Sequence, residues 1–292
     1  MTGEGSPIPR KKVVIPDSPL PVMWLPLPML EDPTVQEVVN KGFHSIMRRG
    51  KYPVTNAYLN IFWEDFCRIR IKYDFEFFAC ICQTITHKEL HKDVPFILNR
   101  AQRKYLVTLE SLRVAGQPID VILLKARQWG GSTLTQLYML WIQICIDNGA
   151  NSVICGDVEN QSRVVSGMLV KCIERMPHWV LKQKFKSAPY QGANSTREIL
   201  PIGSRYTIGS MQKPDKIRSE NVALAHLTEV GLWKETKGKK PEDLVQSIFG
   251  TVLPGPNTMK VLESTAKGVG IYFHRPWQGA PLRSTGLPFT IS

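Results

Sequence analysis

The sequence predicts an α/β fold in which a mostly parallel β-sheet is flanked by helices. Short apolar runs with the length of buried strands occur at 121–124, 152–155, 222–227 and 258–262, with a further short strand expected at 206–210. Segments with helical spacing lie between the runs, at 134–146, 159–174 and 241–252. This alternation of strand and helix is typical of a parallel sheet.

Size, charge and cysteine usage narrow the class of protein. The 292 residues are enough for one or two domains with a large core. A net charge of +12 favours a polyanionic partner, with nucleic acid first and an anionic membrane surface second. The six cysteines form no CxxC pair and indicate reduced thiols. Because no apolar run reaches the ~20 residues that span a bilayer, and no signal peptide is evident, we expect a soluble, intracellular protein.

The chain begins with two segments that precede the predicted sheet. Residues 1–33 are rich in proline, which removes backbone donors, and we expect an arm with little regular structure there. Residues 34–94 show helical spacing and are expected to form a helical accessory region. Within it, His87 and His91 are four residues apart and could share a helix face, but no third ligand is visible, so we favour ordinary histidines over a metal site.

The predicted nucleotide-binding region starts with an extended apolar segment at Pro95 and a helix that begins near Asn99. Gln102 lies in the first turn of this helix. Its side-chain amide carries both a donor and an acceptor, the pair of groups needed to recognise the edge of adenine. Taken alone, a surface glutamine is by far the more common interpretation of such a residue.

A glycine-rich loop follows the first predicted strand of the sheet. The sequence VILLKARQWGGST places Gly130 and Gly131 between an apolar strand and an amphipathic helix. Backbone N–H groups and the positive end of the helix dipole then converge on one spot, which favours a bound phosphate. The usual phosphate-loop pattern has a lysine where Gly131 stands. Lys125 and Arg127 lie before the glycines instead, and either could reach a phosphate from that end of the loop.

Two later strands end in polar residues. The run 222–227 is followed by Thr228 and Glu229, and the run 258–262 is followed by Glu263, Ser264 and Thr265. Ligands of open α/β sheets bind at the carboxyl ends of the strands, so Glu229 is placed to polarise an attacking water. Thr228 occupies the position where nucleotide hydrolases usually have an aspartate that holds the magnesium shell. The hydroxyls of Ser264 and Thr265 could hydrogen-bond a γ-phosphate or its water.

These segments occur in the order found in a known family. NRAQR (99–103), KARQWGGST (125–133), HLTEVGLW (226–233) and ESTAKG (263–268) resemble the ATPase domain of the large terminase subunit, which packages DNA into viral capsids. A phosphate loop with its lysine shifted to the front is common in this family and uncommon elsewhere. The resemblance covers about residues 95–277 and implies a P-loop NTPase of the RecA-like, additional-strand type with an N-terminal helical extension. The tail is then 278–292.

The resemblance implies roles for matching residues, with ATP as the substrate and Mg²⁺ as the metal. Gln102 would contact adenine, and Ser264 and Thr265 would couple hydrolysis to movement on DNA. Glu229, Arg127 and Arg218 would act in catalysis, Arg218 as a finger offered to a neighbouring subunit. Ser132, Thr133 and Thr228 would hold the metal. The nucleotide-binding set would be Gln102, Lys125, Ala126, Arg127, Gln128, Trp129, Gly130, Gly131, Ser132 and Thr133.

The implied activity is an ATP hydrolase that drives double-stranded DNA into a procapsid. The implied partners are the portal protein, the small terminase subunit and further copies of the chain in a ring, at the procapsid portal in the cytoplasm of the infected host cell and without a membrane. Terminases usually carry a nuclease domain with a cluster of metal-binding acids. The sequence has no such cluster, so we expect no nuclease activity from this chain. Another nucleic-acid motor, such as a helicase, and a non-catalytic component that binds nucleotide or DNA remain the alternatives.

Overall fold

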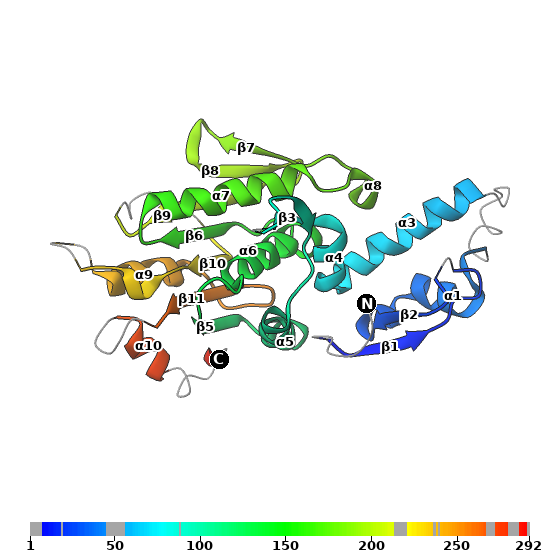
Figure 1. Cartoon of the computed structure of the whole chain (residues 1–292), viewed down its shortest axis with the longest axis horizontal. Coiled ribbons are helices and arrows are strands. Elements are labelled where there is room, and N and C mark those ends of the chain that lie inside the picture. The colour runs from blue at the N-terminus through cyan, green and yellow to red at the C-terminus, as the bar shows by residue number, and fades with distance from the viewer. Residues whose placement is uncertain are drawn as a thin grey trace. The chain divides into compact units, whose positions relative to one another are not determined.

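The computed structural model of the chain describes residues 8–18, 20–44, 56–87, 89–212, 221–235, 238, 240–266, 272–279 and 286–290 (Figure 1). It divides into two units. The N-terminal unit comprises Met1–Leu98 and Pro177–Lys184, and the sheet unit comprises Asn99–Met176 and Phe185–Ser292. Each unit is described by itself below.

The sheet unit is built on eight strands in the order β12-β5-β11-β10-β6-β9-β8-β7. The strands are β5 (Ile119–Lys125), β6 (Ser152–Gly156), β7 (Lys186–Tyr190), β8 (Ala193–Leu200), β9 (Ser204–Ser210), β10 (Leu224–Leu227), β11 (Met259–Thr265) and β12 (Gly286–Thr290). All neighbours from β12 to β9 pair in parallel, whereas β8 pairs antiparallel with both β9 and β7. The predicted mostly parallel sheet is confirmed. Strand β11 lies between β5 and β10, as the additional-strand type requires.

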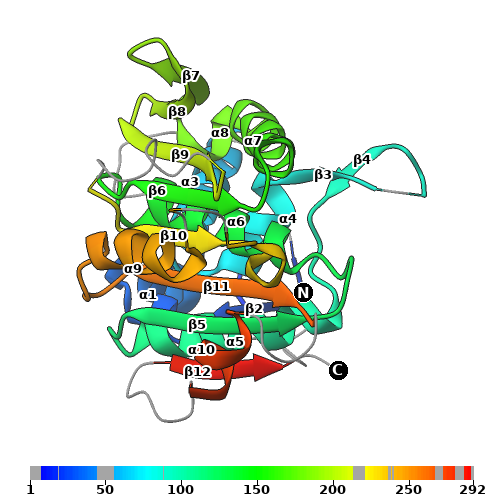
Figure 2. The ribbon, with the colours of Figure 1, turned by 90° about the vertical axis from the view of Figure 1, so that its left-hand side faces the viewer.

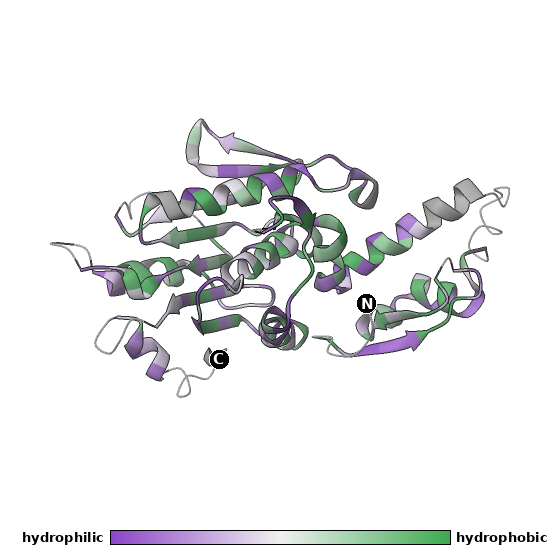
Figure 3. Cartoon of the chain, viewed as in Figure 1, coloured by the Kyte–Doolittle hydropathy of each residue, from purple (hydrophilic) through white to green (hydrophobic). Residues whose placement is uncertain are grey.

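Helices cover both faces of this sheet (Figure 2). They are α5 (Arg100–Val114), α6 (Gly131–Trp141), its π-helical continuation η2 (Ile142–Ile146), α7 (Glu159–Glu174), η4 (Val230–Leu232), α9 (Pro241–Thr251) and α10 (His274–Gly279). Leu244, Val245 and Ile248 of α9 form one buried cluster with Ile122 of β5 and Leu262 of β11. Figure 2 places α9 and α10 in front of the strands, with α6 behind them. The central strand β6 is buried along its whole length, and Figure 3 colours most of it as hydrophobic.

Two parts of the sheet unit differ from the sequence prediction. The sequence predicted no helix or strand between 174 and 206, but the antiparallel pair β7 and β8 lies there. The sequence assigned residues 278–292 to a tail without any element, but α10 extends to Gly279 and β12 pairs with β5 at the edge of the sheet. Strand β12 has only five residues, and proline is one of them, so its sequence carries little strand signal.

The N-terminal unit combines helices with two small sheets. Its elements are β1 (Arg10–Val13), β2 (Met23–Pro26), η1 (Pro28–Glu31), α1 (Pro33–Lys41), α3 (Asn56–Tyr73), α4 (Phe75–Cys82), β3 (Thr84–Thr86), β4 (Asp93–Pro95) and α8 (His178–Leu181). The predicted helices within 34–94 are therefore present, together with the pair β3 and β4. His87 and His91 lie in the connection between these two strands, so the suggestion that they share a helix face is wrong.

The proline-rich arm is more regular than its composition predicts. Strands β1 and β2 pair antiparallel over residues 10–13 and 23–26, and the expectation of little regular structure is wrong there. The prolines do not interrupt the pairing because, of those that the structure describes, only Pro26 lies within a strand, at its end. Met23 and Leu25 are buried in a cluster with Val38 and Phe66 of the helices. Burial of these apolar side chains stabilises the arm.

Among the described residues, no helix has the length and apolar character needed to cross a membrane.

Candidate nucleotide-binding site

The glycine-rich loop ends where α6 begins. Gly130 is the N-cap of α6 and has a φ of 85°, in the left-handed region that favours glycine. A Cβ atom at Gly130 would lie 2.5 Å from Nε2 of Gln102, so a larger residue does not fit without movement of that side chain. Asn99 donates from Nδ2 to the carbonyl oxygen of Trp129 over 3.0 Å. The loop is therefore fastened to the start of α5 at two successive residues.

Both the nitrogen and the oxygen of the Gln102 side-chain amide form hydrogen bonds at this point. Its Nε2 atom donates to the carbonyl oxygen of Gly130 over 3.1 Å, and its Oε1 atom accepts from the backbone N–H of Asn99 over 2.9 Å. The second bond is half of a capping box at the start of α5. The side chain is buried, and it does not line the cavity described below. A contact of Gln102 with adenine would replace these bonds, and that role stays a prediction.

Alternation along the strands brings four polar side chains to the face of the sheet that α6 covers. Lys125 ends β5, Glu263 and Thr265 end β11, and Thr228 follows β10. Thr265 lies opposite Lys125 in the parallel register of β5 and β11. Because side chains of a strand point alternately to opposite faces, Glu263 and Thr265 share one face, while Leu262 packs against α9 on the other.

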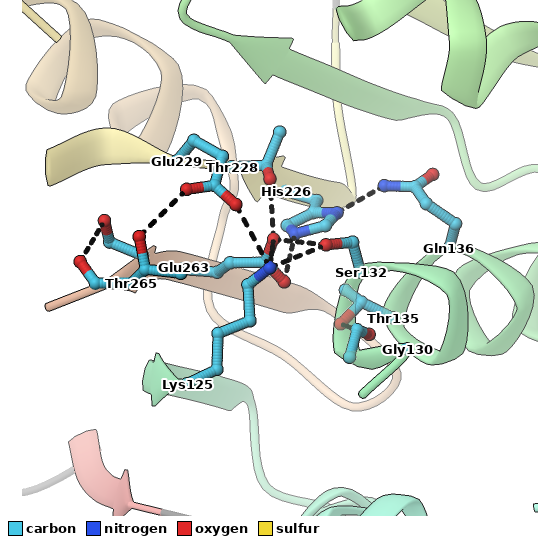
Figure 4. A network of polar contacts seen from close by, with 12 residues as sticks. Lys125, Gly130, Ser132, Thr135, Gln136, His226, Thr228, Glu229, Glu263 and Thr265 are labelled. Carbon is cyan, nitrogen blue, oxygen red and sulfur yellow. Dashed lines mark hydrogen bonds and ion pairs between the residues drawn. The ribbon is translucent and has the colours of Figure 1, made fainter. Parts of the chain in front are cut away.

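The Lys125 ammonium lies at the centre of this group (Figure 4). Its Nζ atom is 3.2 Å from Oγ of Ser132 and 3.2 Å from Oε1 of Glu229. It is also 3.3 Å from Oε1 of Glu263. Burial would lower the pKa of Lys125, but the two carboxylates, Glu263 first, raise the pKa above its ordinary value. Lys125 is therefore a fully charged cation held at the start of the loop.

Glu263 is the residue at this site to which the sequence assigned no role. Its Oε1 atom accepts from Oγ of Ser132 over 2.5 Å and from Oγ1 of Thr228 over 2.6 Å. The side chain is completely buried. Burial would raise its pKa, but His226, Lys125 and the Ser132 hydroxyl together lower the pKa of Glu263 to about 2. A carboxylate is therefore ionised in the interior, held between the loop helix and the end of β10.

Two features of the sequence bear on the presence of a carboxylate at this position. Glu263 directly follows the apolar run 258–262, and Thr228 replaces the acid usual at the end of β10. Neither feature identifies a role until the pairing of the strands is known.

Glu229 turns the chain sharply where β10 ends. It adopts a φ of 55°, which non-glycine residues rarely do, and it precedes the short helix η4. Its Oε1 atom faces Lys125, and its Oε2 atom accepts from Oγ1 of Thr265 over 3.4 Å. A strained backbone at the end of a strand is often found at functional sites. The prediction that a strand-end carboxylate lies beside the phosphate loop agrees with these contacts.

A cavity of about 390 Å³ opens between the loop and these strand ends, within the size range of small-molecule sites. Glu229, Thr228 and Thr265 line it from the strands. The remaining lining residues are Lys125, Arg127, Gln128, Ser132, Val165 and Leu232.

The other predicted site residues lie at different distances from the cavity. Ala126, Arg127 and Gln128 are exposed, and the last two line the cavity. Trp129 packs its ring edge-on against Tyr105, and Thr133 does not line the cavity, unlike Ser132. Ser264 accepts from the backbone N–H of Gly231 over 2.9 Å, on η4. Arg218 lies outside the described residues.

The residues around the cavity fit a magnesium-bound nucleotide. The start of the 11-residue helix α6 and the cations Lys125 and Arg127 suit phosphate oxygens. Among the described residues, no group of three or more His, Cys, Asp and Glu side chains could hold a metal by itself. Mg²⁺ does not need such a group, because it commonly takes one or two carboxylates with phosphates and waters. Carboxylates and the hydroxyls of Ser132 and Thr228 supply oxygen ligands of that kind.

Comparison with known proteins finds similar folds among solved structures, whereas no family model and no curated protein sequence matches the chain. Three of the similar structures are of large terminases. The ATPase domain of the Thermus phage P74-26 large terminase is 15% identical, with a TM-score of 0.42, over 63% of this chain and 78% of that chain. A mutant of that domain is 15% identical with a TM-score of 0.41, over 63% of this chain and 80% of the other. The large terminase of a thermophilic bacteriophage, in complex with ADP, is 13% identical with a TM-score of 0.48, over 67% of this chain and 45% of that chain.

Proposed function

We propose that the chain hydrolyses ATP with Mg²⁺ and uses the energy to move double-stranded viral DNA into a procapsid. The observation that carries the hydrolytic part is the placement of Lys125, Ser132 and Glu229 around one cavity at the start of α6. This is the set of groups that phosphoryl transfer needs: cations for the phosphates, an oxygen ligand for the metal and a carboxylate for the water.

The residues of the site divide the work of hydrolysis. Backbone N–H groups at the start of α6 bind the phosphate oxygens, and Lys125 and Arg127 neutralise their charge. Ser132 and Thr228 hold the metal through their hydroxyls. When bound, the magnesium ion stabilises the negative charge that develops on the phosphate oxygens. Glu229 orients and polarises the attacking water, and Thr265, which hydrogen-bonds Glu229, positions that carboxylate.

The DNA-packaging part rests on the motif resemblance and on charge. A net charge of +12 favours binding to a polyanion, and contacts to phosphates give affinity that is independent of sequence and sensitive to salt. Thr265 belongs to the segment that resembles the coupling motif, and it contacts Glu229 directly. Departure of the γ-phosphate would therefore alter a contact of β11, which is the first step in coupling hydrolysis to movement.

The proposed assembly is a ring of copies at the portal protein, working with the small terminase subunit in the cytoplasm of the infected cell. Arg218 is the proposed finger that one copy offers to its neighbour, where it would stabilise charge in the transition state. A single copy would then hydrolyse ATP slowly.

Phosphate release from ATP and Mg²⁺ tests the function. The chain is assayed alone, with double-stranded DNA, with single-stranded DNA, and with the small terminase subunit. We expect release that rises with double-stranded DNA. Stimulation by single strands together with strand separation would point to a helicase, and no release under any of these conditions would leave a non-catalytic binding component.

A further inference from the structure

The end of β10 lacks the acid that usually holds the magnesium shell, and the structure contains a carboxylate at that point from another strand. Thr228 occupies the position of the missing acid. Its Oγ1 atom donates to Oε1 of Glu263 over 2.6 Å, so the carboxylate lies beside the residue that fails to supply one.

Glu263 reaches this point because of the strand order. Strand β11 lies between β5, which leads into the loop, and β10, which ends at Thr228. A side chain on β11 can therefore contact both neighbours. The Glu263 Oε1 atom does so, accepting from Ser132 at the start of α6 over 2.5 Å and from Thr228 over 2.6 Å. The carboxylate thus bridges the two hydroxyls proposed to hold the metal.

The second oxygen of Glu263 faces a histidine. Oε2 lies 3.2 Å from Nε2 of His226, which is ion-pair range. A fully buried carboxylate needs such a partner, since an unpaired one costs free energy. His226 therefore holds Oε2, and Oε1 is the oxygen that faces the hydroxyls of Ser132 and Thr228.

A cation already lies between the oxygens of the site. The Lys125 ammonium is within 3.3 Å of Ser132, Glu229 and Glu263 (Figure 4). Two carboxylates face this single positive charge. A divalent cation would match their charge, and it would also allow Lys125 to turn to the phosphates at the start of the loop.

We infer that Glu263 supplies the metal-holding carboxylate that the end of β10 lacks, and that the Lys125 ammonium holds the cation position until magnesium and nucleotide arrive. The acid of the magnesium site, which usually follows the strand at the position of β10, would thus come from the neighbouring strand β11. This inference rests on the proposed function and deepens it. It makes Glu263 a metal-holding residue, distinct from Glu229, which acts on the water.

The first test measures binding of a fluorescent ADP analogue with and without Mg²⁺. In the wild-type chain Mg²⁺ should tighten binding. Glu263→Gln keeps the size of the side chain and removes its charge, so metal-free binding should persist while the Mg²⁺ effect falls by about ten- to a hundredfold, the scale seen when metal sites lose supporting groups. The double variant Thr228→Asp with Glu263→Gln returns a carboxylate to β10. It should recover the Mg²⁺ effect, which a merely structural role of Glu263 would not allow.

The second test does not require Glu263 to be changed. Mn²⁺ replaces Mg²⁺ in the complex with ADP, and glutamate carrying ¹³C in its side-chain carboxylate is incorporated into the chain. Electron–nuclear double resonance then detects a carboxylate carbon coupled to the metal. The coupling should be present in the wild type and should persist in Glu229→Gln, whose only change is at the other carboxylate.

The outcomes of the two tests distinguish failure of the inference from failure of the proposed function. An unchanged Mg²⁺ effect in Glu263→Gln, no carboxylate coupling in the wild type, or a coupling lost in Glu229→Gln would overturn the inference and leave the proposed function in place. A wild-type chain that binds no nucleotide with or without Mg²⁺ would overturn the proposed function itself.

Discussion

Ser132, the second residue of α6, donates a 2.5 Å hydrogen bond to the buried carboxylate of Glu263 on β11. This contact joins the phosphate loop to the strand that carries the proposed coupling residues. Because Glu263 is also bonded to Thr228, a change at the loop is transmitted to the end of β10 through a single side chain.

Gly130→Ala should destabilise the chain and weaken nucleotide binding. An alanine at a φ of 85° costs about 1 kcal/mol in backbone strain, and its Cβ would lie 2.5 Å from Nε2 of Gln102. The matched control is Gly116→Ala, because Gly116 also has positive φ but no heavy atom within 4 Å of the added Cβ. Chemical denaturation should show a larger loss of unfolding free energy for Gly130→Ala than for Gly116→Ala. Equal losses and unchanged nucleotide binding would mean that the contact with Gln102 has no effect.

Gln102→Ala should separate the loop from α5. Loss of the capping-box bond and of the bond to Gly130 should cost about 1–2 kcal/mol of unfolding free energy. Binding of ATP and of GTP distinguishes the two roles of this residue. If Gln102 only anchors the loop, affinity for both nucleotides should fall by the same factor. If it reads adenine, ATP binding should fall more, and the preference for ATP over GTP should shrink.

The acid stability of the chain should depend on Glu263. Burial alone would raise its pKa, but the nearby His226 and Lys125 and the Ser132 hydroxyl lower it to about 2 in the folded chain, against an ordinary value of 4.5. A depressed folded pKa contributes stability above the unfolded pKa, and that contribution is lost as pH falls from about 5 to about 2. At neutral pH, ionised Glu263 contributes on the order of 3 kcal/mol to the free energy of unfolding. The stability gap between wild type and Glu263→Gln, measured by urea unfolding, should therefore narrow through this window. A gap that stays constant with pH would contradict the ionised, paired state of Glu263.

The N-terminal unit should depend on a buried ion pair. Arg10 contacts both carboxylate oxygens of Asp74, at 2.5 and 2.7 Å, and Arg70 contacts the same group at 3.1 Å. Asp74→Ala would remove the carboxylate that the two buried arginines share and should cost about 3–5 kcal/mol of unfolding free energy. Lys41→Ala is the control, since the pair of Lys41 with Glu37 is 3.9 Å long and exposed at the lysine. Thermal unfolding should detect the first change and barely detect the second.

Most of the sheet could be predicted from the sequence because its strands are buried on both faces and therefore appear as apolar runs. The run at 121–124 and the helix at 159–174 correspond to β5 and α7. Strands β1 and β2 could not be predicted, because their pairing with each other, not their composition, makes the arm regular. Strand β12 was missed since its five residues pair only with β5, a contact that no local pattern indicates.

The site was predictable where one segment contains the whole signal. Gly130, Lys125 and Ser132 belong to one loop, and Glu229 directly follows an apolar strand. The role of Glu263 can be recognised only once the order of the strands is known, because its partners Ser132 and Thr228 are 131 and 35 residues away in the sequence. The internal bonds of Gln102 likewise depend on how α5 meets the loop.

The central claim is that Glu229 activates the water that attacks ATP. Steady-state phosphate release by Glu229→Gln, compared with wild type and with the exposed-residue control Glu242→Gln, tests it most directly. The account predicts that Glu229→Gln binds ATP and hydrolyses it at least about a hundredfold more slowly, while Glu242→Gln keeps the wild-type rate. Hydrolysis by Glu229→Gln at the wild-type rate would contradict the account.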